Sequence, residues 1–198
     1  MGPTNANLAA LIGSRICHDL ISPIGAINNG LELLTMSGSA EGPELDLIGQ
    51  SVGNASARIR FFRIAFGAAG DQMVGRAEIA SVLHDLHAGS RLELSWRPAE
   101  PQPRSAVRLA FLGIMCLETG MPYGGRIDVD ESDGQWQLLG VADKFNVDPD
   151  LWEILAATDL PQHLQPAHVQ FALMPRIALD EGRRVVSQAD AEMLRISF

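Results

Sequence analysis

The chain has 198 residues, with 15 basic and 24 acidic side chains and a formal net charge of −9. This length is sufficient for one or two domains with a hydrophobic core, and the acidic balance argues against a nucleic-acid partner. We find no apolar run near the roughly 20 residues of a membrane span and expect neither a secretion signal nor membrane contact. Because Cys17 and Cys116 do not make a disulfide framework, we expect a cytoplasmic protein.

The first segment, 5–36, is predicted to form one long helix that Pro23 bends. Its apolar residues recur at spacings of three and four, which is typical of a bundle seam: Cys17, Leu20, Ile24, Ile27, Leu31 and Leu34. His18 lies about 130° around the helix from the middle of this seam, at ~100° per residue. We therefore expect an exposed imidazole and a buried Cys17. The face around His18 is polar or small and suited to docking: Arg15, Ser22, Gly25 and Asn29.

A second amphipathic helix is predicted over 44–69, after a Gly- and Pro-containing turn at 37–43. The two helices would form an antiparallel hairpin. Since two helices cannot enclose both apolar stripes, we expect dimerisation into a four-helix bundle. Arg58, Arg60 and Arg63 cluster late in the second helix, where they either form a solvated face or assist docking.

The pattern changes after Gly70, which predicts a hairpin domain over 1–70 and a second domain over 76–198. The second domain is predicted to contain helices at 76–88, 105–119, 150–157 and 167–179, a loop at 97–103, and strands at 91–96, 126–130, 136–142, 184–188 and 192–198. This order indicates an α+β protein whose C-terminal half is an α/β sandwich of helices over one mixed sheet.

The segment 18–24, His-Asp-Leu-Ile-Ser-Pro-Ile, resembles the phosphoacceptor box of sensor histidine kinases. The longer stretch 17–34 resembles the ChpT-type histidine phosphotransferases, and the similarity continues more loosely into the second domain. The resemblance implies that His18 carries a phosphoryl group and that Asp19 orients the ring or takes its other proton.

The second domain follows the element order of a kinase ATPase domain but departs from it at the nucleotide residues. Leu112 and Cys116 stand where a kinase has magnesium-binding asparagines, and Phe145 and Val147 replace two glycines of the acidic nucleotide box. The glycine-rich lid is replaced by 164–168. Side chains there fill the space that phosphates need, and no oxygen ligand remains for magnesium. The resemblance therefore implies an ATPase-like domain without a nucleotide site.

These features predict a homodimeric phosphotransferase of a bacterial phosphorelay. It would accept a phosphoryl group on His18 from a receiver-domain aspartate of a hybrid histidine kinase and pass it to a response-regulator aspartate. We expect no cofactor or metal of its own, with Mg²⁺ held by the partner receiver. The pair His84 and His87 has metal-like spacing but no evident third ligand.

Two alternatives remain open. An atypical ATP-dependent histidine kinase fragment would bind an ATP analogue with magnesium. A non-enzymatic adaptor docking on response regulators would bind a receiver without labelling His18.

Overall fold

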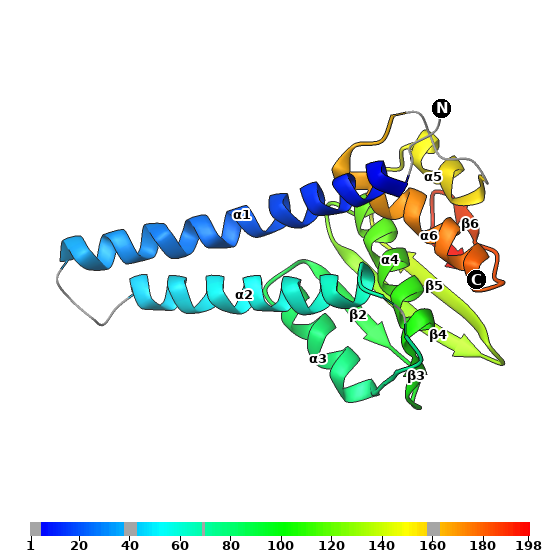
Figure 1. Ribbon diagram of the computed structural model, residues 1–198, viewed down its shortest axis with the longest axis horizontal. Helices are drawn as coiled ribbons and strands as arrows, with labels where there is room; N and C mark the ends of the chain where they lie inside the picture. Colours follow the sequence, from blue (N-terminus) through cyan, green and yellow to red (C-terminus); the bar gives the residue numbers. More distant parts are fainter. Residues whose placement is uncertain (1–4, 38–42, 69, 158–162) are drawn as a thin grey trace.

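The computed structural model describes residues 5–37, 43–68, 70–157 and 163–198. Two long helices, α1 (Asn5–Ser37) and α2 (Pro43–Ala65), lie side by side in antiparallel directions and project from the rest of the molecule (Figure 1). α1 continues through Pro23. The helical hairpin therefore forms as predicted, while most of the predicted turn lies outside the described residues.

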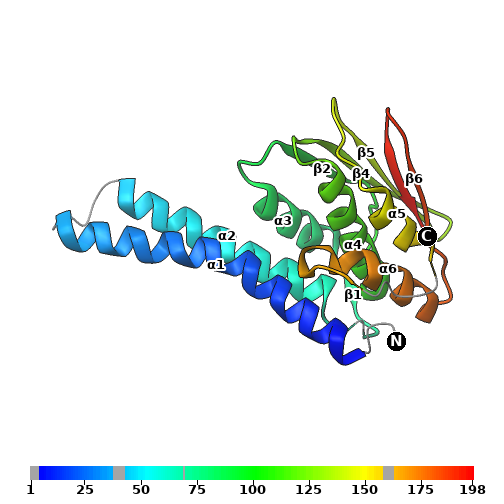
Figure 2. The same cartoon turned by 90° about the horizontal axis from the view of Figure 1, so that it is seen from above.

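The C-terminal half places helices on a mixed sheet. The helical elements are α3 (Arg76–His87), α4 (Arg104–Gly120), α5 (Pro149–Ala156), the short 3₁₀ helix η1 (Pro166–His168) and α6 (Val169–Asp180). The sheet strands are β2 (Leu92–Trp96), β4 (Gly125–Ser132), β5 (Gln135–Val141), β6 (Val186–Ala189) and β7 (Leu194–Ser197). Among the described residues this sheet has five strands in the order β2-β4-β5-β7-β6, with β2 parallel to β4 and the other neighbours antiparallel. α3, α4 and α6 lie on one face of it, which confirms the predicted α+β class (Figure 2).

Two short strands were not predicted. β1 (Met73–Val74) pairs antiparallel with β3 (Gln102–Pro103), within segments that the sequence indicates as a domain boundary and a loop. A strand of two residues shows no alternation of apolar and polar side chains, so its pairing is visible only in the fold.

α2 ends at Ala65, several residues before the predicted end at 69. The backbone then reaches Gly67, where an added Cβ would lie 2.2 Å from the carbonyl oxygen of Arg63. Arginines of α4 satisfy the carbonyl groups at this end: Arg104 Nη2 donates to Arg63 O at 2.8 Å, and Arg108 Nε donates to Ala65 O at 3.4 Å. Cationic side chains at a helix C-terminus also interact favourably with the partial negative charge of the helix dipole.

The base of the hairpin shares a hydrophobic core with the C-terminal half. Phe61 of α2 stacks on Phe111 of α4 with ring centroids 4.6 Å apart and an interplanar angle of 8°. Both side chains are buried, and Phe111 also meets Trp96 edge-to-face. The hairpin is therefore packed against the central helix of the second domain.

The expected burial of Cys17 is wrong for the single chain, because its side chain is exposed. α2 packs against the side of α1 that carries Pro23 and Gly30, where an added Cβ on Gly30 would lie 2.5 Å from Ile48 Cγ1. Cys17 lies about 100° or more from that side, at ~100° per residue. With Ile24 and Leu31 it forms an exposed flank of the predicted seam.

We expect Phe61→Ala to lower the free energy of unfolding by about 3–5 kcal/mol, because it removes a buried ring and leaves a cavity. Leu179→Ala, on an exposed residue of α6, is the control and should change it by no more than about 0.5 kcal/mol. Urea unfolding followed by circular dichroism measures both, and an equal effect of the two substitutions would contradict the shared core.

Candidate functional site

His18 projects from the middle of α1 into solvent, with its side chain 82% exposed. Its Nδ1 lies 3.1 Å from Oδ1 of Asp19. When Nδ1 carries the proton it donates to this carboxylate, and the lone pair of Nε2 faces solvent. Nε2 has no hydrogen-bond partner within the described ranges. The geometry therefore presents one ring nitrogen to an incoming electrophile.

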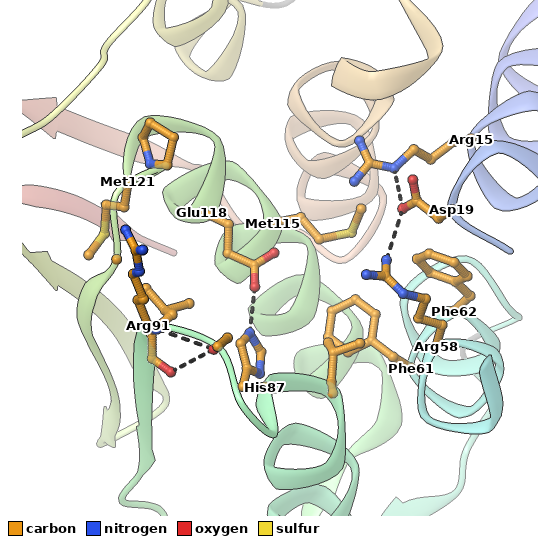
Figure 3. A pocket seen from close by; sticks show the side chains of 15 residues that line it. Arg15, Asp19, Arg58, Phe61, Phe62, His87, Arg91, Met115, Glu118 and Met121 are labelled. Atoms are coloured by element: carbon orange, nitrogen blue, oxygen red, sulfur yellow. Dashed lines mark hydrogen bonds and ion pairs between the residues drawn. The ribbon is translucent and has the colours of Figure 1, made fainter. Parts of the chain in front are cut away.

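Asp19 is held between two arginines and is only 10% exposed. Arg15, one turn earlier on α1, donates from Nε to Oδ2 at 2.8 Å, and Nη1 of Arg58 on α2 lies 3.7 Å from the same oxygen (Figure 3). The carboxylate thus has one oxygen for His18 and one for the two guanidinium groups. This arrangement holds the Asp19 carboxylate in place beside Nδ1 of His18.

Arg15, expected on the docking face, is directed into the junction between the hairpin and the second domain. Its side chain is 20% exposed, and Nη1 donates to the backbone carbonyl of Ala167 in η1. The sequence gives no signal for this contact, because the two residues are 152 positions apart. The contact connects the His18 site to η1 of the second domain.

The three arginines late in α2 do not act as one cluster. Arg58 reaches Asp19, Arg60 forms an ion pair with Asp85 of α3, and Arg63 is exposed. The sequence identifies the group, but the choice of Arg58 requires knowing which face of α2 meets α1.

The remaining residues of the expected docking face are small or polar and lie on the His18 side of α1. Ser22 and Asn29 are exposed, and nothing lies within 4 Å of a Cβ added to Gly25. Ser22 also lines a groove of about 880 Å³ between the hairpin and α3, together with Arg60 and Asp85. The described surface beside His18 is therefore open to a macromolecular partner.

A second cavity, of about 400 Å³, is lined by Asp19 and its two arginine partners. His87 in its wall is 9% exposed; Nδ1 lies 2.8 Å from Leu83 O, and Nε2 lies 2.5 Å from Oε1 of Glu118. Both ring nitrogens face acceptors, so the imidazolium satisfies both contacts. Burial favours neutral His87, as does the charge of Arg58, but Glu118 and the Leu83 carbonyl outweigh them and raise the pKa.

His84 does not join His87 in a metal site. Within the described part of the chain, no group of three or more His, Cys, Asp or Glu side chains could hold a metal ion.

The positions matched to kinase nucleotide residues carry apolar side chains in the interior. Leu112 and Cys116 are both 0% exposed in α4, and burial raises the pKa of the Cys116 thiol well above its usual range. Phe145 and Val147 pack against the same core.

Comparison with known proteins agrees with this architecture. A family model described as the histidine phosphotransferase C-terminal domain matches residues 76–193. The protein phosphotransferase ChpT of Brucella abortus (strain 2308) is 33% identical over 193 residues, covering 94% of this chain and 92% of that protein. The structure of a bacterial phosphotransferase superposes with a TM-score of 0.82 at 32% identity, covering 100% of this chain and 99% of the other.

The family model and the curated relative together indicate a phosphotransferase, and the chain belongs to the family of ChpT-type histidine phosphotransferases. The histidine kinase AdeS of Acinetobacter baumannii superposes with a TM-score of only 0.42 at 9% identity, so the ATPase-like character of the second domain stays a prediction. In the described residues, no helix is long and apolar enough to cross a membrane.

We expect the His87–Glu118 pair to stabilise the protein at low pH. Because the folded-state pKa is raised above the ordinary 6.5, this contribution is complete below pH 6.5 and is lost as pH rises through the folded-state pKa. Glu118→Gln should remove it and lower the pKa of His87. NMR titration of the imidazole and urea unfolding across this window measure both effects; an unchanged titration in the variant would contradict the pairing.

Proposed function

We propose that this protein accepts a phosphoryl group on His18 from a receiver-domain aspartate of a hybrid histidine kinase and passes it to an aspartate of a response regulator. The observation that carries the proposal is the exposed imidazole whose Nδ1 faces a fixed carboxylate, in a chain of this family. The setting is a bacterial phosphorelay in the cytoplasm.

The chemistry requires mainly positioning. Nε2 of neutral His18 forms the N–P bond as the O–P bond of the aspartyl phosphate breaks, and the aspartate carboxylate leaves. In the second step, the carboxylate of the acceptor aspartate attacks the phosphorus and the imidazole leaves. Asp19 holds the Nδ1 proton throughout, and Arg15 and Arg58 hold Asp19. The partner receiver supplies Mg²⁺, and Ser22, Gly25 and Asn29 form the surface on which it docks.

Dimerisation is supported by two exposed ladders with a seven-residue repeat. Cys17, Ile24 and Leu31 form one on α1, and the corresponding ladder on α2 consists of Leu45, Val52 and Ile59. A heptad repeat of apolar residues on each helix is what a four-helix bundle buries. We propose that a second copy covers both ladders and leaves His18, on the far side of α1, exposed.

Autokinase activity is not expected. Leu112 and Cys116 are fully buried where a kinase requires polar ligands, so the domain offers magnesium no side-chain oxygen at these positions. This supports transfer between receivers over an ATP-dependent reaction. The remaining alternative, an adaptor, differs only in whether His18 carries the phosphoryl group.

We expect His18→Ala to abolish transfer of radiolabel from a phosphorylated receiver to this protein, because it removes the nucleophile. His163→Ala, on another exposed histidine, is the matched control and should leave labelling unchanged. Receiver binding, measured by calorimetry, should persist in both variants. Undiminished labelling of the His18 variant would refute the proposal, whereas receiver binding without any label on the wild-type protein would favour an adaptor.

We expect Val52→Glu to weaken the dimer by about a hundredfold or more, because burying an unpaired carboxylate costs several kcal/mol. Val186→Glu is the control, since Val186 is 58% exposed on β6 and Val52 is 50% exposed on α2. Analytical ultracentrifugation measures both. A monomeric wild-type protein, or a dimer that Val52→Glu leaves unaffected, would contradict the proposed dimer.

A further inference from the structure

The cavity beside Asp19 has the composition of a ligand site that phosphotransfer does not use. It is formed where α1, α2, α3, α4 and the start of β2 meet, and its volume of about 400 Å³ lies within the range of small-molecule pockets. Its floor is apolar and consists of residues from the shared core: Phe61, Phe62, Leu92, Met115 and Met121.

Some charged side chains in the cavity wall have an oppositely charged partner, and one has none in the described part of the chain. Asp19 is engaged by Arg15 and Arg58, and the carboxylate of Glu118 is engaged by His87. Arg91 is exposed to solvent at the cavity, and its guanidinium has no ion pair or hydrogen bond among the described residues. Arg91 and Met121 lie on one side of the His87–Glu118 pair, and the Asp19 group lies on the other (Figure 3).

The backbone holds Arg91 at this position. The carbonyl of Arg91 accepts a hydrogen bond from Gly125 N at 3.1 Å, and a Cβ added to Gly124 would lie 2.4 Å from Arg91 O. Gly124 has φ +98, a conformation that suits glycine. The Gly-Gly pair therefore brings the unpaired cation close to the apolar floor.

We propose that this cavity binds a small amphipathic monoanion, with its acid group on Arg91 and its apolar body over Met121, Leu92 and Met115. An acid group on Arg91 forms a charge-assisted contact that the described residues do not supply. An apolar tail displaces water from the floor, which is favourable in proportion to the area covered. Such a ligand would lie beside Asp19 without covering the solvent-facing Nε2 of His18.

The test uses the full chain with labelled methionine methyl groups and decanoate as the probe. We expect decanoate to shift the Met115 and Met121 methyl resonances saturably and to leave Met36, 79% exposed in the hairpin, unmoved. Arg91→Gln should weaken binding at least about fivefold, and Arg184→Gln, on an exposed arginine away from the cavity, should not change it. Decanol, which has the tail without the charge, should bind more weakly than decanoate. Decyl sulfate, a monoanion like decanoate, in a parallel titration distinguishes a sulfate from a carboxylate headgroup.

The measurement needs no receiver and no phosphate, so its outcome is independent of the proposed function. Both arginine variants keep their fold if their amide spectra match the wild type away from the substitution. Shifts confined to Met36 would place decanoate on the apolar hairpin and overturn the proposal. Equal affinity of Arg91→Gln and the wild type, equal binding of decanol, or no binding of decanoate would also overturn it.

Discussion

The packing of α2 against α4 is the constraint on which the rest of the structure depends. The Phe61–Phe111 stack joins the hairpin to the second domain through side chains that exclude water, and Arg104 and Arg108 satisfy the end of α2 at the same place. Leu8 adds a second attachment by packing against Val169 and Ala172 of α6. Both helices of the hairpin are therefore fixed at their base, and the position of His18 relative to the second domain follows from this packing.

The ionic contacts around Asp19 depend on this packing, because it sets where α1 and α2 lie relative to each other and to the second domain. A carboxylate that is 10% exposed needs compensation, and Arg15 and Arg58 supply it from two different helices. Arg15 also donates to the Ala167 carbonyl, so the group that orients the imidazole is itself connected to the second domain. A change in the angle between hairpin and second domain would therefore reach His18 through one side chain. This gives the second domain a physical connection to the proposed transfer site at His18.

The sequence was sufficient for features that repeat or that are local. The periods of three and four predicted both hairpin helices, and the position of His18 relative to the seam predicted its exposure, since these depend only on helix geometry. It was insufficient where distant segments meet. The early end of α2, the pairing of β1 with β3, the Arg15–Ala167 contact and the selection of Arg58 all depend on tertiary packing. The exposed Cys17 shows the same limit. The apolar spacing identifies the residues of the seam, but it does not indicate which of them α2 covers.

The two sides of α1 differ in chemical character, which would allow one helix to make both proposed contacts, one with a second copy and one with a receiver. Residues spaced by seven keep the same face, so Cys17, Ile24 and Leu31 form a continuous apolar line. A polar or small side chain on this line would weaken the proposed assembly. On the opposite side, Ser22, Gly25 and Asn29 leave room around His18, and a large apolar side chain there would obstruct the proposed docking of a receiver. The helix period separates the two sets of residues, so a substitution on the apolar line leaves the proposed docking residues unchanged, and the reverse also holds.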